Sequence, residues 1–376
     1  MALFLFAFFL VYGSVHFYSF LRIKTALNLH LGACLVLGVF MLAMIFAPLI
    51  VRMLEGRGHE EAAVIGSYIG YLWMGLVFFF FCCSMILDIY RAALNGVEWI
   101  FKKDFTFMLP SPLYTLLIPL VVAAALFAYA YLEARNVRME KITVASTKIP
   151  AGSPPLRIVQ ISDVHVGLII RENRLRRVLE LVEQAKPDLL VATGDLVDGQ
   201  VDHIEGCADD FMKINPRFGK YAIMGNHEYY AGFDHARAFI RRAGFRLLRG
   251  EGAEAAGGLI NLIGFDEPTG RGFGVFRNIS EEYLNAHLSE DKFTLFLRHR
   301  PDVDFLGRFD LQLSGHTHRG QIFPFNYITR VIFPMNGGLY PLGRAYLYVN
   351  RGAGTWGPPL RFLSPPEITI IELVHK

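Results

Sequence analysis

Four long apolar stretches in the first third of the chain constrain its fold more than any other feature of the sequence. They run from Ala2 to Leu21, from Leu27 to Val51, from Ala62 to Leu87 and from Leu113 to Leu132, without a Lys, Arg, Asp or Glu. Each has the roughly 20 residues that a helix needs to cross the hydrocarbon core of a bilayer. The first is too long for the core of a signal peptide and lacks a basic start. The sequence therefore predicts a multi-pass region of four transmembrane helices over residues 1–132.

The remainder of the chain has the composition of a soluble protein. Residues 133–155 are polar and end in Gly152-Ser153-Pro154-Pro155, so we expect a linker there and one domain over residues 156–376. Residues 1–155 hold 11 Lys and Arg against 8 Asp and Glu, whereas residues 156–376 hold 26 of each. This neutral balance argues against a nucleic-acid partner bound by a basic surface. Cys207 is the single cysteine of residues 156–376, which excludes a disulfide framework in that domain.

The basic residues between the predicted spans indicate which side of the membrane each loop faces. The loops after the first and third spans hold five of them, and the loop after the second span holds two together with three glutamates. Because basic loops prefer the cytoplasm, we expect both termini and the domain of residues 156–376 to lie outside the cytoplasm at the cell membrane. Arg135, Arg138 and Lys141, just after the fourth span, favour the opposite orientation.

The domain of residues 156–376 alternates short apolar strands with helical and loop segments. The predicted strands are residues 156–161, 188–192, 221–224, 259–264, 293–297 and 311–313, and a helix is predicted over residues 171–184. Short apolar strands between helices predict a layered α/β domain. Polar groups follow most of the strands directly, where loops can present them around one site.

Five groups of candidate ligands occur in order along this domain. They are Asp163 with His165, then Asp195, then Asn226 with His227, then His299, and finally His316 with His318. An Asp-x-His or His-x-His segment places two side chains on one face of an extended chain. Carboxylate, imidazole and amide groups suit divalent Mn, Fe or Zn. The set is too large for one tetrahedral ion, so the sequence predicts two ions that share a carboxylate, a pairing that promotes phosphoryl transfer.

Taken together, these residues resemble the motifs of the calcineurin-like metallophosphoesterase family. The matching segments are Asp163-Val164-His165, Gly194-Asp195, Gly225-Asn226-His227-Glu228, His299 and Gly315-His316-Thr317-His318. The resemblance extends from Leu156 to the C-terminus, and residues 351–355 and 365–368 are similar to the branch of YkuE/YaeI-type membrane-associated phosphodiesterases. Arg319 departs from that branch, which usually has glycine there, and four spans exceed its usual short anchor.

The resemblance implies a two-sheet sandwich flanked by helices, together with a role for each candidate residue. Asp163, His165, Asp195 and His318 would hold one metal ion, and Asp195, Asn226, His299 and His316 would hold the second. His227 would face the phosphoryl group, stabilise its charge and protonate the leaving oxygen. The two ions would lower the pKa of a bridging water, and the resulting hydroxide would attack phosphorus.

These observations predict a membrane-anchored, metal-dependent phosphoesterase that acts on a phosphodiester or a pyrophosphate. Anchoring beside the bilayer motivates the hypothesis of a lipid-linked substrate. The alternative is a non-catalytic metal-binding scaffold or sensor, although such proteins usually lose ligands that this sequence keeps. Two further features stay open: Asp198 is a candidate to line the site, and the apolar segment 322–348 is either core or a surface that rests on the bilayer or holds an acyl chain.

Overall fold

The computed structural model describes residues 2–199, 204–305 and 307–376. The chain divides into two compact units. The first comprises the residues up to Tyr131 together with Gly357–Pro359, and the second comprises Leu132–Trp356 and Leu360–Lys376.

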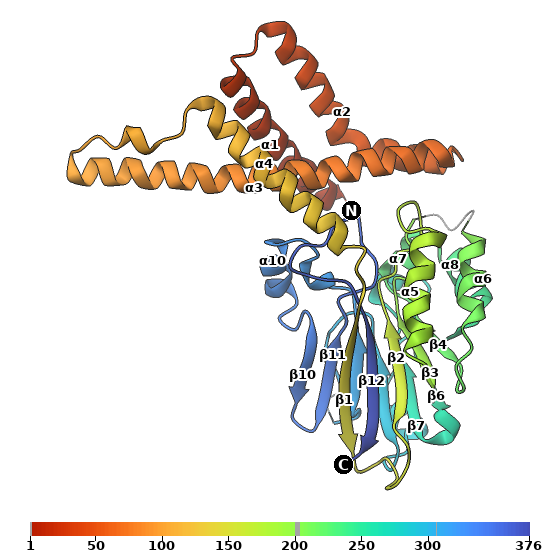
Figure 1. Ribbon diagram of the computed structural model, residues 1–376. Coiled ribbons are helices and arrows are strands. Elements are labelled where there is room, and N and C mark those ends of the chain that lie inside the picture. The colour runs from red at the N-terminus through yellow and green to blue at the C-terminus, as the bar shows by residue number, and fades with distance from the viewer. Residues whose placement is uncertain (1, 200–203, 306) are drawn as a thin grey trace. The chain divides into compact units, whose positions relative to one another are not determined.

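The N-terminal unit is built on four long apolar helices, as predicted (Figure 1). They are α1 (Ala2–Leu27), α2 (Leu31–Gly56), α3 (Glu60–Phe101) and α4 (Pro112–Glu133), and a short 3-10 turn, η1 (Thr106–Met108), lies between the last two. All four helices are long and apolar enough to cross a membrane. The part of the chain that holds them is therefore suited to membrane association.

Two helix boundaries differ from those expected. The second helix begins at Leu31 because Asn28 adopts a left-handed conformation and the His30 side chain accepts a hydrogen bond from the Ala33 N–H as a cap. The third helix does not end at Leu87 but continues to Phe101, because residues 88–101 contain no proline to interrupt it. With 42 residues, α3 is about 60 Å long, about twice the thickness of the hydrocarbon core.

Polar side chains of α1 and α3 pair with one another. The Trp73 Nε1–H donates to His16 Nε2 over 2.9 Å, and His16 is almost fully buried. The Arg22 guanidinium lies 2.7 Å from one Asp88 carboxylate oxygen, and the Tyr18 hydroxyl donates to the other over 2.5 Å. These contacts match donors and acceptors within the helical unit, as an apolar surrounding requires.

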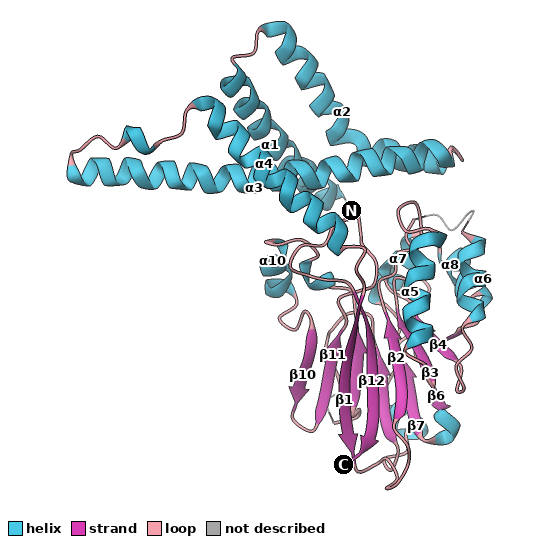
Figure 2. Cartoon of the chain, in the orientation of Figure 1, coloured by secondary structure: helices cyan, strands magenta, loops and turns pink. Residues whose placement is uncertain are grey.

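The described residues of the C-terminal unit form two six-stranded sheets, which confirms the predicted α/β sandwich (Figure 2). In spatial order the first sheet holds β1 (Arg138–Ser146), β12 (Glu367–His375), β2 (Leu156–Ile161), β3 (Leu189–Thr193), β4 (Lys220–Ile223) and β5 (Arg246–Leu247). The second holds β10 (Gly338–Leu342), β11 (Ala345–Val349), β9 (Leu311–Ser314), β8 (Phe293–Leu297), β7 (Ile260–Gly264) and β6 (Glu251–Ala255). The strands β2, β3 and β4 are parallel to one another, as are β7, β8 and β9.

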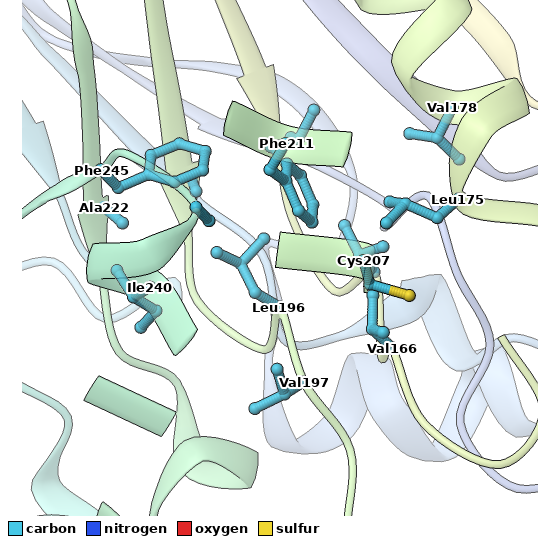
Figure 3. Close-up of a cluster of buried hydrophobic side chains, with 14 of the residues drawn as sticks. Val166, Leu175, Val178, Leu196, Val197, Cys207, Phe211, Ala222, Ile240 and Phe245 are labelled. Carbon is cyan, nitrogen blue, oxygen red and sulfur yellow. The ribbon is translucent and has the colours of Figure 1, made fainter. Parts of the chain in front are cut away.

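Apolar side chains fill the space between the sheets and cover the outer face of the first. Alternate residues of β2 point to opposite faces, so Ile158 packs between the sheets while Val159 packs under the helices. The outer layer consists of α5 (Glu172–Gln184), α6 (Glu205–Lys213) and α8 (Phe233–Arg242). On α5, Leu175 and Val178 face this core together with Cys207 and Phe211 of α6 (Figure 3). Burial raises the pKa of the Cys207 thiol to about 11, which makes it an inert core residue.

Residues 133–155, which were expected to be a linker, contain the strand β1. It pairs in parallel with β12, from Arg138 beside Glu367 to Ser146 beside His375. Because β1 is the outermost strand of its sheet, several of its side chains face solvent and are polar. This polar composition is similar to that of a linker, which is why the strand was not predicted. The strand ties the beginning of the C-terminal unit to its end.

Candidate metal centre

The candidate ligands all lie at one edge of the two sheets, which we call the site edge. It is formed by the carboxyl ends of β2, β3, β4, β8 and β9, whose following loops converge. These loops carry Asp163 and His165, Asp195, Asn226 and His227, His299, and His316 and His318, respectively. Asn226 and His227 open the short helix α7 (Asn226–Tyr230). The structure brings together all eight residues that the sequence singled out.

The first cluster consists of Asp163, His165 and His318, whose potential ligand atoms all lie within 4.8 Å of one another. The His165 and His318 Nε2 atoms are 3.0 Å apart, and His318 Nε2 is 3.4 Å from a carboxylate oxygen of Asp163. All three side chains are buried. Among the described residues, none supplies a hydrogen-bond partner for the buried His165 Nδ1. Nitrogen and oxygen lone pairs that converge in this way fit a divalent cation.

The second cluster consists of Asp195, His299 and His316. His299 Nε2 lies 3.2 Å from Asp195 Oδ2, 3.1 Å from His316 Nδ1 and 3.2 Å from the side-chain oxygen of Asn226. Asp195 Oδ2 is also 3.8 Å from His165 Nε2 of the first cluster. The Asp195 carboxylate therefore lies between both groups of ligands.

Backbone strain marks the ligand loops. Asp163, His165, Asp195, His316 and His318 all have positive φ, between 46° and 69°. Residues other than glycine rarely adopt backbone conformations with positive φ. Each such residue destabilises the fold by about 1–3 kcal/mol, so the surrounding structure must hold it in place. Strain of this kind is typical of functional sites, where it aims side chains that an ordinary strand or helix would point elsewhere.

Two glycines make room for the ligands. A Cβ atom at Gly225 would collide with the Asp195 carboxylate, and a Cβ atom at Gly315 would collide with Ser162 and with the carboxylate of Asp163. Both positions therefore require glycine for steric reasons. The sequence motifs Gly225-Asn226-His227 and Gly315-His316-Thr317-His318 include these glycines because of this close approach.

Glu228 fixes the loops after β3 and β4, a role that sequence reasoning did not assign. Its carboxylate is fully buried and accepts hydrogen bonds from the backbone N–H groups of Asp195 (2.9 Å), Leu196 (2.6 Å), Val197 (3.2 Å) and Gly225 (2.7 Å). The bonds satisfy buried donors in a segment without regular structure. Its place in the segment Gly225-Asn226-His227-Glu228 was the signal that could have revealed it.

Arg361 is a second residue that supports the ligand loops, and no motif around it in the sequence predicts this role. Its side chain is fully buried, donates to the carbonyls of Gly354 (3.1 Å) and Arg351 (2.8 Å), and lies 2.9 Å from His318 Nδ1. Burial lowers the pKa of Arg361 to about 9. The guanidinium thus joins the segment before β12 to the ligand loop after β9.

Asp198 orients the candidate catalytic residue His227. The His227 Nδ1–H donates to a carboxylate oxygen of Asp198 over 2.7 Å, which leaves Nε2 as the ring nitrogen that can reach a substrate. The His227 backbone N–H donates to Asp195 Oδ1 over 2.9 Å, and its ring packs edge-on against His165 with centroids 4.6 Å apart. His227 therefore borders both clusters, and Asp198 lines the site as the sequence suggested.

Opposite charges stabilise one another among the protein groups of the site. Burial alone would lower the pKa of His299, but Asp195 raises it to about 10. Burial also lowers the pKa of His227, yet Asp195 and Asp198 raise it to about 9. Burial opposes ionisation of Asp195, but the neighbouring His299 and His227 hold its pKa well below the usual range. Burial together with the charge of His299 lowers the pKa of His316 to about 3.

A hydrogen bond to a backbone carbonyl sets which ring nitrogen of His299 faces the second cluster. The His299 Nδ1–H donates to the backbone carbonyl of Thr193 over 2.8 Å, so Nε2 is directed at Asp195 and His316. A backbone carbonyl that fixes the tautomer in this way is a recurring feature of metal-binding histidines.

Comparison with known proteins shows similarity over most of the C-terminal unit. Residues 156–320 match the family model of the calcineurin-like phosphoesterases. The chain is 40% identical over 261 residues to an uncharacterized metallophosphoesterase of Aquifex aeolicus, covering 68% of this chain and 98% of that protein. It is 34% identical over 265 residues to the uncharacterized metallophosphoesterase YkuE of Bacillus subtilis, covering 66% and 89%. A transmembrane protein with metallophosphoesterase domain from Danio rerio is 30% identical over 279 residues, covering 68% and 62%.

Proposed function

The chain belongs to the calcineurin-like metallophosphoesterase family, and we propose that it is a membrane-anchored hydrolase of a phosphodiester or pyrophosphate bond that uses two divalent metal ions. The observation that carries this proposal is the position of Asp195, whose carboxylate lies within 4 Å of ring nitrogens from both ligand clusters. A shared carboxylate between two groups of nitrogen and oxygen ligands is what a pair of ions requires.

The donor set indicates which residues would hold the ions. Asp163, His165, Asp195 and His318 would bind one, and Asp195, Asn226, His299 and His316 would bind the other. This mixture of imidazole, carboxylate and amide oxygen suits Mn, Fe or Zn. When bound, the ions would polarise a phosphoryl oxygen and lower the pKa of a bound water.

The remaining steps belong to side chains of the protein. His227 would hold a proton on Nε2, because Asp198 engages its Nδ1 and the neighbouring carboxylates raise its pKa to about 9. A protonated His227 can stabilise charge on the phosphoryl group and give its proton to the leaving oxygen. Asp198 acts through His227 by holding the ring in one orientation. No side chain needs to attack phosphorus.

We further propose that the substrate is linked to a lipid and that the four helices cross the membrane. Support comes from the length and apolar character of α1 to α4 and from the relative in Danio rerio that is described as a transmembrane protein. The excess of basic residues after the first and third predicted spans, residues 2–21 and 62–87, favours an extracytoplasmic catalytic unit. An epitope tag after Lys376 tests this orientation, because protection of the tag from external protease in intact cells would place the unit in the cytoplasm.

The decisive test of the activity is hydrolysis of bis-p-nitrophenyl phosphate by the full chain in detergent, after chelation and again with Mn restored. We expect turnover only with metal, and we expect Asp195→Asn to abolish it. Asp234→Asn on the exposed surface of α8 is the matched control and should leave turnover unchanged. His227→Ala should lose most turnover while it keeps its metal content. A protein that binds no metal would instead favour the scaffold or sensor alternative.

A further inference from the structure

The helix α10 (Phe325–Ile332) carries an apolar surface beside the metal centre. It follows the ligand loop and η4 (His318–Gly320) directly, after the strained residue Gln321. Phe333, at its end, packs edge-on against the ring of His316 with centroids 5.2 Å apart. The Thr317 hydroxyl donates to the carbonyl of Asn336 over 2.9 Å. The position of α10 is therefore fixed relative to the ligands.

Most of the apolar side chains of α10 face solvent. We call Tyr327, Ile328, Val331 and Ile332 the α10 surface, and between 58% and 83% of each residue is exposed. The contiguous apolar face is too large to be the scattered exposure of single apolar residues that soluble proteins tolerate. The apolar segment 322–348 is therefore not explained by core packing alone.

Other exposed apolar residues of the C-terminal unit gather at the same edge. Leu339 is the second residue of β10 and pairs with Tyr348 near the carboxyl end of β11, and Trp356 and Leu363 lie between β11 and β12. Met139 of β1 and Phe273 of η3 (Pro268–Phe273) are exposed as well, and Met212, at the end of α6 that leads to β4 and so away from the site edge, departs from this pattern. Most of the exposed apolar side chains of the described part of this unit thus lie at the site edge.

The segment around α10 carries basic residues but no acidic ones. Residues 311–366 contain five arginines and no Asp or Glu. Arg319 and Arg330 are exposed next to the α10 surface, whereas Arg361 is buried. An exposed apolar face flanked by arginines, without acidic residues, fits the headgroup layer of a bilayer that carries anionic lipids.

The chain also enters the C-terminal unit at the site edge. β1 begins at Arg138 beside the first residue of β12, and β12 runs antiparallel to β2, so the start of β1 lies at the end of β2 that carries Asp163. Glu133, the last residue of α4, pairs with Arg138, and the Arg174 guanidinium donates to the Ala134 carbonyl over 2.9 Å. Because α4 is apolar and long enough to cross a membrane, the edge that bears the site is the part of this unit closest along the chain to a bilayer.

We propose that the α10 surface rests in the headgroup layer of an anionic bilayer and holds the metal centre at that surface. A phosphate ester in the headgroup layer then reaches the site without leaving the membrane, a consequence that rests on the proposed function. The docking itself does not depend on catalysis. A soluble protein partner or a second copy of the chain would be an alternative occupant, and the experiment separates these outcomes.

The experiment places a photo-crosslinking amino acid, p-benzoylphenylalanine, at Ile328 in the full chain. Met212 is the matched control position, because both residues are apolar and 58% exposed. The two proteins are reconstituted into vesicles of phosphatidylethanolamine and radiolabelled phosphatidylglycerol and then illuminated. We expect about tenfold more lipid adduct at position 328 than at position 212, since burial of one large apolar side chain shifts an equilibrium by at least that factor.

Equal lipid labelling at the two positions would overturn the proposal, as would a chain-to-chain adduct as the main product at position 328. Vesicles in which equally radiolabelled phosphatidylcholine replaces the phosphatidylglycerol should give a lower yield at position 328, because Arg319 and Arg330 then lose their anionic partners. The result stands apart from the proposed activity, because a catalytically inactive Asp195→Asn protein should label in the same way. Val331, at 83% exposure, provides a second position if substitution of Ile328 disturbs folding.

Discussion

Replacement of Glu228 by glutamine should destabilise the C-terminal unit far more than a conservative change normally does. In the structure, one carboxylate oxygen accepts from the N–H groups of Asp195 and Gly225, and the other from those of Leu196 and Val197. A glutamine NH₂ group must take the place of one of these oxygens, so two buried N–H groups lose their acceptor whichever way the amide is turned.

Each unpaired N–H costs about 1–3 kcal/mol, which gives about 4 kcal/mol for the pair. For a unit of this size, that free energy corresponds to a fall in Tm of roughly 10 °C. The assay is thermal unfolding of the full chain in detergent after chelation, so that metal binding does not contribute. The strained Asp195, whose N–H Glu228 holds, should also bind metal more weakly.

Glu180→Gln is the matched control, because Glu180 is exposed on α5 and its change should alter stability by no more than about 0.5 kcal/mol. The reasoning is refuted if the two variants have the same Tm. It is refuted equally if Glu228→Gln loses stability while its metal affinity stays at the wild-type value, since the carboxylate would then not position the ligand loop.

Three further predictions concern the metal centre. Asp198→Asn weakens the contact that orients His227, and we expect kcat to fall by about 10–100-fold with unchanged metal content, measured by steady-state kinetics and elemental analysis. Metal affinity should strengthen as pH rises toward 10, by up to about tenfold per pH unit for each proton displaced, because His299 has a pKa of about 10 and must lose its proton to bind; calorimetry in buffers of different ionisation enthalpy should detect proton release, and pH-independent affinity would contradict this. Arg361→Lys should lower the free energy of unfolding by about 2–4 kcal/mol, because an ammonium cannot reach both carbonyls and His318; a wild-type unfolding curve in denaturant would contradict it.

The elements that sequence analysis predicted are those whose residue pattern can be recognised within one short segment of the chain. β2 and β8 have the predicted bounds because an apolar run flanked by polar residues can be read without a partner. The candidate ligands were found in the same way, because each lies in a short motif after a strand. Their convergence follows from parallel strands, whose carboxyl ends lie at one edge of a sheet.

The elements that were missed depend on distant partners. β1 is an edge strand with charged side chains, and its register is set by β12, more than 200 residues later in the chain. Arg361 reaches the site only because residues 351–364 fold back onto the loop of His318. The continuation of α3 to Phe101 as one helix was not predicted for a different reason. The apolar run ends at Leu87, but a change from apolar to charged residues does not by itself end a helix.

The place of β12 between β1 and β2 has a consequence for how the protein is made. β1 and β2 are synthesised long before residues 367–375. Each of the two strands therefore has an unpaired edge until β12, which pairs with both, has been synthesised. With the membrane-spanning arrangement proposed for α1 to α4, these helices can already insert during this interval, while the first sheet is incomplete. Nascent chains that stop before β12 should therefore remain protease-sensitive throughout the C-terminal unit, because the first sheet lacks the strand that joins β1 to β2.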